Sequence, residues 1–325
     1  MELLQQVKHC DSNCQRNIQT RRAIALFLIA QPEILVDNLC IDKSKAYYWN
    51  EYELTPLTLA SYKGYFDIVA ELLRQGADPN FLTRFNGDIN TPLTMASTLG
   101  EAKCTHVLSD KYDSFNTPPD CRPYSCDMVQ SEHCDVYFKI IEILFEYGAD
   151  PDLSDKNIEE TYYGGLEEPV QHENFGLTPL ILATWQGDRK QVEYLLKQGA
   201  NPNNRGLGNW GLTLLHLAII RYDHKNRQDK NEYFDIAELL LKNGANPNIK
   251  ANGRNVSKGT PLITACRDGY DQLVKLLFCH ANVDLSIENE FGKTARDVTW
   301  EKSTSILDLL DRYFLYQKGN TDSFC

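Results

Sequence analysis

Residues 55–80 read TPLTLASYKGYFDIVAELLRQGADPN. The stretch opens on Thr55-Pro56-Leu57 and closes on the pentapeptide Gly76-Ala77-Asp78-Pro79-Asn80. Threonine is a good helix N-cap because its hydroxyl accepts an unpaired backbone N–H, and proline fits the first helical position. The apolar residues between Ile68 and Leu73 are spaced to cover one helical stripe, and glycine favours the left-handed conformation that ends many helices. The stretch therefore predicts two short helices followed by an extended finger.

Both motifs recur along the chain. The tripeptide returns as Thr91-Pro92-Leu93, Thr178-Pro179-Leu180 and Thr260-Pro261-Leu262, with Thr213-Leu214-Leu215 as a variant and Thr294 in a degenerate last copy. The pentapeptide returns in the segments that begin at Gly148, Gly199 and Gly244, with a worn copy at His280-Ala281-Asn282-Val283-Asp284. One such unit cannot bury its apolar face alone, so the copies are expected to stack on one another.

The combination strongly resembles the ankyrin repeat, which has a 33-residue period and a Thr-Pro-Leu-His signature. The resemblance covers roughly residues 50–315. It implies an all-α, ankyrin-repeat solenoid of helix-turn-helix units with β-hairpin or finger loops, about six repeats and terminal caps. It also implies a protein–protein interaction module (an adaptor, inhibitor or targeting subunit) whose partner lies in the concave groove formed by the fingers and first helices.

Irregular spacings between the motifs predict where the chain departs from the plain repeat. Insertions in a solenoid map to loops, often on a binding face. The expected organisation is an N-terminal helical cap (1–48), repeats (49–295) with insertions at 100–134, 157–174 and 222–232, a C-terminal capping helix (296–316) and a tail (317–325).

The composition of the chain limits the classes of partner and the cellular locations that are expected. A net charge of −12 disfavours contact with a phosphate backbone, so no nucleic-acid partner is expected. The longest apolar stretch, Ala23–Ala30, is shorter than the roughly 20 residues needed to span a bilayer, so no membrane insertion is expected. The N-terminus lacks the pattern of a secretory signal. The ten cysteines are therefore expected to be reduced thiols of a cytoplasmic monomer.

Alignment of the copies on the motif threonine identifies a candidate binding surface. Aromatic residues and arginine dominate binding hot spots. The candidate partner-binding residues are, three places before the threonine, Tyr52, Phe175, Trp210 and Phe291, and, seven or eight places after it, Tyr62, Trp185, Arg221 and Arg267. The alternative for the finger aromatics is that they pack on the next finger. Tyr62 and Trp185 are expected outside the buried stripe, where they favour binding.

The first insertion suggests a second class of function. Zinc takes thiolate and imidazole ligands, and six such residues lie close together: Cys104, His106, Cys121, Cys126, His133 and Cys134. The alternative is a metal-stabilised or redox-responsive regulator. The spacings lack a paired knuckle of two cysteines separated by two residues, so ordinary thiols, with no metal and no cofactor, are the prediction.

Two further alternatives concern the acidic insertion and the source of the chain. The insertion 157–174 carries five glutamates and two tyrosines, which suit either a loop that binds a basic partner or a solvated loop.

The irregular insertions and the many Asn, Lys, Ile and Tyr residues also resemble ankyrin proteins that intracellular bacteria deliver into host cells. That resemblance implies an effector acting on a host protein in the host cytosol.

No catalytic motif of the common hydrolase, kinase, nucleotide-binding or metalloprotease classes occurs in the sequence. His216 stands at the histidine position of the repeat signature and is interpreted as structural. The other copies carry Thr58, Thr94, Ile181 and Ile263 there, which a catalytic role would not tolerate. The chain is therefore not expected to be an enzyme.

Overall fold

The computed structural model describes residues 40–41, 53–85, 88–98, 131–153, 178–206, 211–222, 229–251, 259–280, 282–299 and 304–319. The chain divides into two compact units, Met1–Asp155 and Lys156–Cys325. The boundary between them falls directly before the acidic insertion expected at 157–174, which lies outside the described residues.

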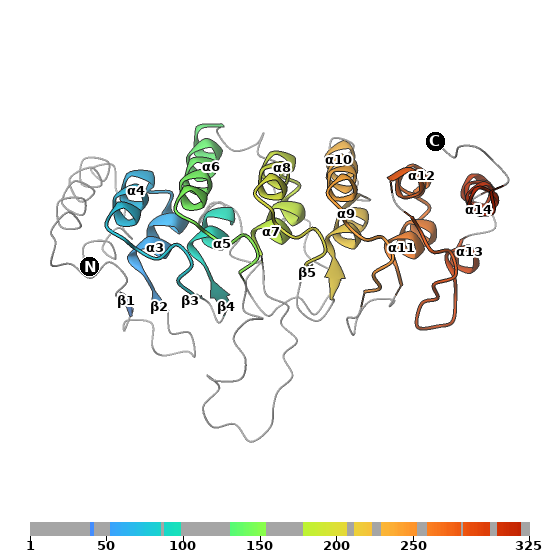
Figure 1. The fold of residues 1–325 in the computed structure, drawn as a ribbon, viewed down its shortest axis with the longest axis horizontal. Helices are drawn as coiled ribbons and strands as arrows, with labels where there is room; N and C mark the ends of the chain where they lie inside the picture. The colour runs from blue at the N-terminus through green and yellow to red at the C-terminus, as the bar shows by residue number, and fades with distance from the viewer. Residues whose placement is uncertain are drawn as a thin grey trace, which may run out of the picture. The chain divides into compact units, whose positions relative to one another are not determined.

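Among its described residues, the first unit contains two helix pairs with short strands at their bases (Figure 1). Its described elements are β1 (Cys40–Ile41), β2 (Glu53–Leu54), α3 (Pro56–Lys63), α4 (Phe66–Arg74), β3 (Thr83–Phe85), β4 (Asp88–Asn90), α5 (Pro92–Ser97) and α6 (Ser131–Glu146). The strands form one antiparallel sheet in the order β1-β2-β3-β4, in which Arg84 pairs with Ile89 in the hairpin β3–β4.

The second unit contains four helix pairs among its described residues. Its elements are α7 (Pro179–Gln186), α8 (Arg189–Lys197), β5 (Arg205–Gly206), β6 (Leu212–Thr213), α9 (Leu214–Tyr222), α10 (Asp229–Lys242), α11 (Pro261–Asp268), α12 (Asp271–His280), α13 (Ala295–Val298) and α14 (Thr304–Gln317). Strands β5 and β6 pair antiparallel, with Arg205 opposite Thr213.

The motif residues act at the helix ends as predicted. Threonine hydroxyls accept the backbone N–H three residues later at the N-caps Thr55, Thr91, Thr178, Thr260 and Thr294. Proline follows four of them at the start of the helix. The first helices α3, α7 and α11 end at glycines in the left-handed region, Gly64, Gly187 and Gly269. These local signals explain why α3, α7 and α11 are only about two turns long.

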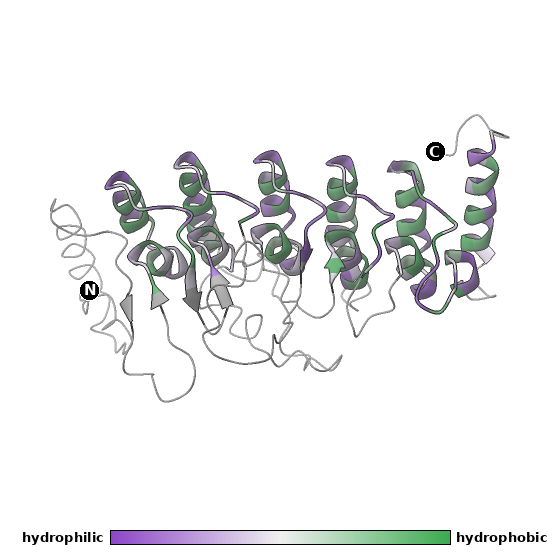
Figure 2. Ribbon diagram, turned by 60° about the horizontal axis from the view of Figure 1, so that its bottom comes forward, coloured by the Kyte–Doolittle hydropathy of each residue, from purple (hydrophilic) through white to green (hydrophobic). Residues whose placement is uncertain are grey.

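The helices of each unit form two layers that enclose the core. In the second unit, α7, α9 and α11 form one layer and α8, α10 and α12 the other (Figure 1). Figure 2 shows hydrophobic residues on the side of the second helices that faces the first helices and hydrophilic residues on the opposite side. Leu195 and Leu240, on α8 and α10, are fully buried. The two layers and their fingers confirm the all-α ankyrin fold, and the described residues contain six helix pairs where about six repeats were expected.

Helix bounds differ from the expected insertions at two places. Helix α6 begins at Ser131, inside the stretch expected as the insertion 100–134. Helix α9 extends to Tyr222 and α10 begins at Asp229, so helix enters the insertion 222–232 from both sides. Tyr222 is only 8% exposed, and its hydroxyl donates to Gln272 of α12, which explains why the helix continues to this residue.

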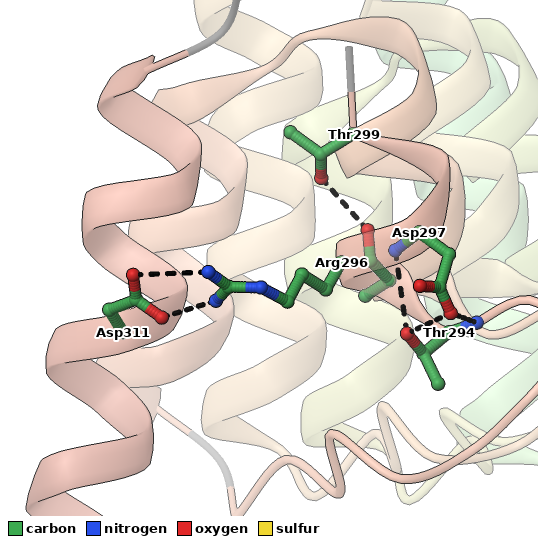
Figure 3. A network of polar contacts seen from close by, with 6 residues as sticks. Thr294, Arg296, Asp297, Thr299 and Asp311 are labelled. Carbon is green, nitrogen blue, oxygen red and sulfur yellow. Dashed lines mark hydrogen bonds and ion pairs between the residues drawn. The ribbon is translucent and has the colours of Figure 1, made fainter. Parts of the chain in front are cut away.

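The C-terminal segment differs as well, because two helices occupy the range expected as one capping helix. Thr294 and Asp297 cap each other's backbone N–H groups and start α13 (Figure 3). The Thr299 hydroxyl donates to the carbonyl of Ala295 where α13 ends. Arg296 on α13 pairs with Asp311 on α14. The two helices therefore form a last helix pair in which the first helix is shortened.

The final residue of the pentapeptide joins neighbouring repeats within each unit. Three asparagines donate their amide to a carbonyl of the next repeat and accept one of its backbone N–H groups. Asn80 bonds to Gly148 and Asp150, Asn203 to Gly244 and Asn246, and Asn248 to Asn282 and Asp284, at 2.7–3.1 Å. A side chain that both donates and accepts can do this, which explains why asparagine recurs at the position.

Candidate protein-binding surface

In each unit, a tyrosine hydroxyl is hydrogen-bonded to a carbonyl in the last turn of a first helix. Tyr137 of α6 donates its hydroxyl to the carbonyl of Tyr62, and Tyr233 of α10 donates to the carbonyl of Trp185, both at 2.9 Å. These carbonyls lie in the last turn of α3 and α7, where helices leave acceptors unpaired. The tyrosine rings lie against Gly64 and Gly187, at which an added Cβ would come within 3.1 Å of the ring. Both tyrosines lie on helices that follow a predicted insertion.

Tyr233 also positions Arg221, which is in the last turn of α9. The Arg221 guanidinium carbon lies 4.3 Å from the centroid of the Trp185 ring and 5.9 Å from that of Tyr233. Its Nε donates to the Tyr233 hydroxyl over 3.4 Å. Trp185 and Arg221 are partly exposed, whereas Tyr233 is buried. Three residues from three helices, Trp185, Arg221 and Tyr233, thus form one cluster, which we call the Trp185 cluster.

Arg267 lies in the last turn of α11 in the next repeat, one place closer to its motif threonine than Arg221 is to Thr213. It is exposed, and its Nε and Nη2 donate to the carboxylate of Asp268 at 2.7 and 3.0 Å. This hydrogen bonding raises the pKa of Arg267 above its ordinary value. Arg221 and Arg267 therefore occupy similar positions, but Arg267 already has an acidic partner.

Phe291 lies in the finger that precedes α13. Its side chain is 70% exposed. Asn289 orders the loop, because its side-chain oxygen accepts the backbone N–H groups of Phe291 and Lys293 at 2.9 and 3.0 Å. A phenylalanine exposed to this degree on an ordered loop does not match the alternative in which finger aromatics pack on a neighbouring finger.

Tyr62 is not part of an exposed surface, and the prediction that it lies outside the buried stripe is wrong. Its side chain is 9% exposed and packs with Leu54 and Met95. Trp185, at the same place in its own repeat, remains partly exposed, and the Arg221 guanidinium lies over its ring.

Three other predicted binding residues, Tyr52, Phe175 and Trp210, lie outside the described residues. So do Cys104, His106, Cys121 and Cys126 of the predicted zinc alternative, as do the side chains of His133 and Cys134. The described residues contain no group of three or more His, Cys, Asp or Glu side chains arranged to hold a metal ion. None of the described helices is long and apolar enough to cross a membrane.

The cysteines on α11 and α12 differ in state. Cys266 is a free thiol, and burial raises its pKa to about 12, so it is not a reactive nucleophile. Cys279 is disulfide-bonded, and the expectation that all cysteines are reduced is wrong for this residue. Because disulfides persist in oxidising compartments, the cysteines give no support for a cytoplasmic location.

His216 is buried and links two repeats, as its structural interpretation predicted. Its Nε2 donates to the carbonyl of Gly259 at 3.0 Å, and its Nδ1 lies 2.8 Å from the Thr213 hydroxyl. Since the Gly259 carbonyl only accepts, Nε2 carries the proton and Nδ1 accepts from Thr213. Burial lowers the pKa of His216 to about 4, and the charge of Arg205 acts in the same direction. The ring is 1% exposed, so it cannot reach a substrate.

The sequence alignment found Trp185, Arg221 and Arg267 but did not identify Tyr233, which holds the first two together. Tyr233 is 48 residues from the carbonyl it binds, and it follows an insertion that has no counterpart in the neighbouring copies. A comparison of the two insertions would have given a signal, because each is followed by a helix with a tyrosine near its start.

Comparisons with known proteins agree with this architecture. Family models match residues 52–84 (ankyrin repeat), 133–251 (ankyrin repeats, three copies) and 240–298 (ankyrin repeats, many copies). The solved structure of the human ASB11 ankyrin repeat domain is similar over 89% of this chain and 93% of that chain, at 21% identity and a TM-score of 0.50. The search of curated proteins gives no match. At this identity the solved structure supports the fold alone, whereas the family models cover most of the chain: it belongs to the ankyrin-repeat family.

Proposed function

We propose that the chain is a protein-binding module without catalytic activity, acting as an adaptor, inhibitor or targeting subunit. The partner binds to the second unit at the ends of the first helices and at the finger tip. The contact residues are Trp185, Arg221, Arg267 and Phe291. Ankyrin repeats generally serve as protein-interaction modules, and these four residues are exposed or partly exposed on first helices and on a finger of the repeats.

The observation that carries the proposal is that the Phe291 side chain is exposed and the Trp185 side chain is partly exposed. Aromatic side chains bury a large area at small entropic cost when a partner covers them, and they are enriched in hot spots. A single exposed aromatic residue on a protein surface is common. Phe291 is held on an ordered finger, and burial of its apolar surface under a partner would be favourable.

Capture experiments with matched variants test the proposal. The full chain is immobilised and exposed to cell lysates as wild type, as Trp185→Ala/Phe291→Ala and as Tyr147→Ala/Phe314→Ala. The last variant is the control, because Tyr147 and Phe314 are 45% and 47% exposed at the ends of helices α6 and α14. Thermal unfolding must show that the three proteins are equally stable.

A protein captured by the wild type is expected to bind Trp185→Ala/Phe291→Ala at least about tenfold more weakly and the control variant equally well. Equal binding to all three proteins would contradict the assignment of the surface.

A further inference from the structure

Arg221 differs from an ordinary surface arginine because its position is fixed before any partner arrives. The guanidinium lies over Trp185 and is hydrogen-bonded to Tyr233, whose own hydroxyl is bonded to the carbonyl of Trp185. A free arginine side chain loses rotamer entropy when a partner fixes it. In the Trp185 cluster a large part of that loss occurs on folding, so a ligand of Arg221 meets a prearranged group.

The charge of Arg221 has no acidic partner among the described residues. Three other arginines of the second unit are in ion pairs: Arg189 with Asp235, Arg267 with Asp268 and Arg296 with Asp311. Arg221 is in none of the ion pairs of the described residues, and only its Nε is in a hydrogen bond there. The two terminal nitrogens keep four N–H donors, and the flat edge they form suits two-point binding of a carboxylate.

We propose that Arg221 binds a glutamate or aspartate carboxylate in an acidic segment of the partner protein. This rests on the proposed function and names the chemistry of the partner at the Trp185 cluster. Trp185 and Tyr233 are positioning residues for Arg221, and Trp185 also adds contact area beside the ion pair. This surface thus recognises an acidic segment of the partner, although the chain that carries the surface has a net negative charge.

The test uses two synthetic probes, an acetylated octaglutamate peptide and an acetylated octaglutamine peptide. Titration of the full chain is followed by the side-chain Nε–H signals of arginine in ¹H–¹⁵N spectra. The Arg221 signal is expected to shift and saturate with octaglutamate and to stay unchanged with octaglutamine. Arg221→Ala is expected to weaken octaglutamate binding by about tenfold or more, and Arg221→Lys is expected not to restore it, since lysine lacks the two-point fork.

Arg74→Ala is the matched control, because Arg74 is on helix α4 of the first unit and pairs with Glu71. Octaglutamate binding that is equal in Arg221→Ala and Arg74→Ala would overturn the inference. So would a peptide with one phosphoserine that binds Arg221 more tightly than octaglutamate, because the site would then be a phosphate site.

The captured protein separates this inference from the proposed function. A partner that is lost by Trp185→Ala/Phe291→Ala but kept by Arg221→Ala would leave the binding surface in place and overturn the carboxylate contact. A partner that is kept by both variants would contradict the binding surface itself.

Discussion

Gly187→Ala is expected to lower the free energy of unfolding by about 2–5 kcal/mol. Gly187 ends α7 with φ +74°, a conformation that costs a residue with a Cβ roughly 1–2 kcal/mol. The new methyl group would lie 3.1 Å from the ring and hydroxyl of Tyr233. Displacing a well-packed buried ring costs a further 1–3 kcal/mol or so. Urea unfolding followed by circular dichroism measures the change.

Gly269→Ala is the control for this prediction. Gly269 ends α11 at the same place in its repeat with φ +79°, but an added Cβ there meets no atom within 4 Å. This variant should therefore show only the backbone cost of about 1–2 kcal/mol. Equal destabilisation of the two variants would mean that Tyr233 does not pack against Gly187. It would also contradict the position of Tyr233 in the Trp185 cluster.

The second large effect is a loss of stability on mild acidification that arises from His216. The folded pKa is about 4, below the ordinary value of 6.5, so the unfolded chain binds the proton more readily. Stability is therefore full above pH 6.5 and falls as the pH decreases from 6.5 towards 4. The expected loss is about 2 kcal/mol by pH 5.

His216→Thr isolates this contribution, because threonine occupies the same position as Thr58 and Thr94 in other repeats. The variant loses the bond to Gly259, so it is expected to be less stable at pH 7.5. Its stability should change by about 2 kcal/mol less than that of the wild type between pH 7.5 and pH 5. Chemical unfolding at the two pH values gives the comparison, and parallel losses would show that His216 is not the group that titrates.

The helix ends of this protein follow from the sequence because their causes are local. Thr178 and Gly187 act through backbone groups within three or four residues, so a single copy of the repeat predicts both caps. The six helix pairs of the described residues follow in the same way. The first helix of the last pair is short because Asp297 and Thr299 engage the backbone around it, which the spacing of apolar residues alone does not indicate.

The composition of the surface was only partly predictable, because contacts between repeats depend on residues far apart in sequence. Tyr62 and Trp185 occupy the same place in the repeat, yet Tyr62 is covered by Met95 and Trp185 is partly open. The stack of Arg221 on Trp185 and the bonds from Asn203 to the next repeat join residues 36 and 41 or more positions apart. An alignment of copies gives the positions of such residues but not the neighbour that covers or orients each one.

Amide hydrogen exchange of the full chain, with and without a captured partner, tests whether this surface binds the partner. We expect the partner to protect the last turns of α7 and α9, around Trp185 and Arg221, and the finger around Phe291. The outer face of α8, α10 and α12 should exchange at unchanged rates. Protection confined to that outer face or to the first unit would contradict the claim that this surface binds the partner.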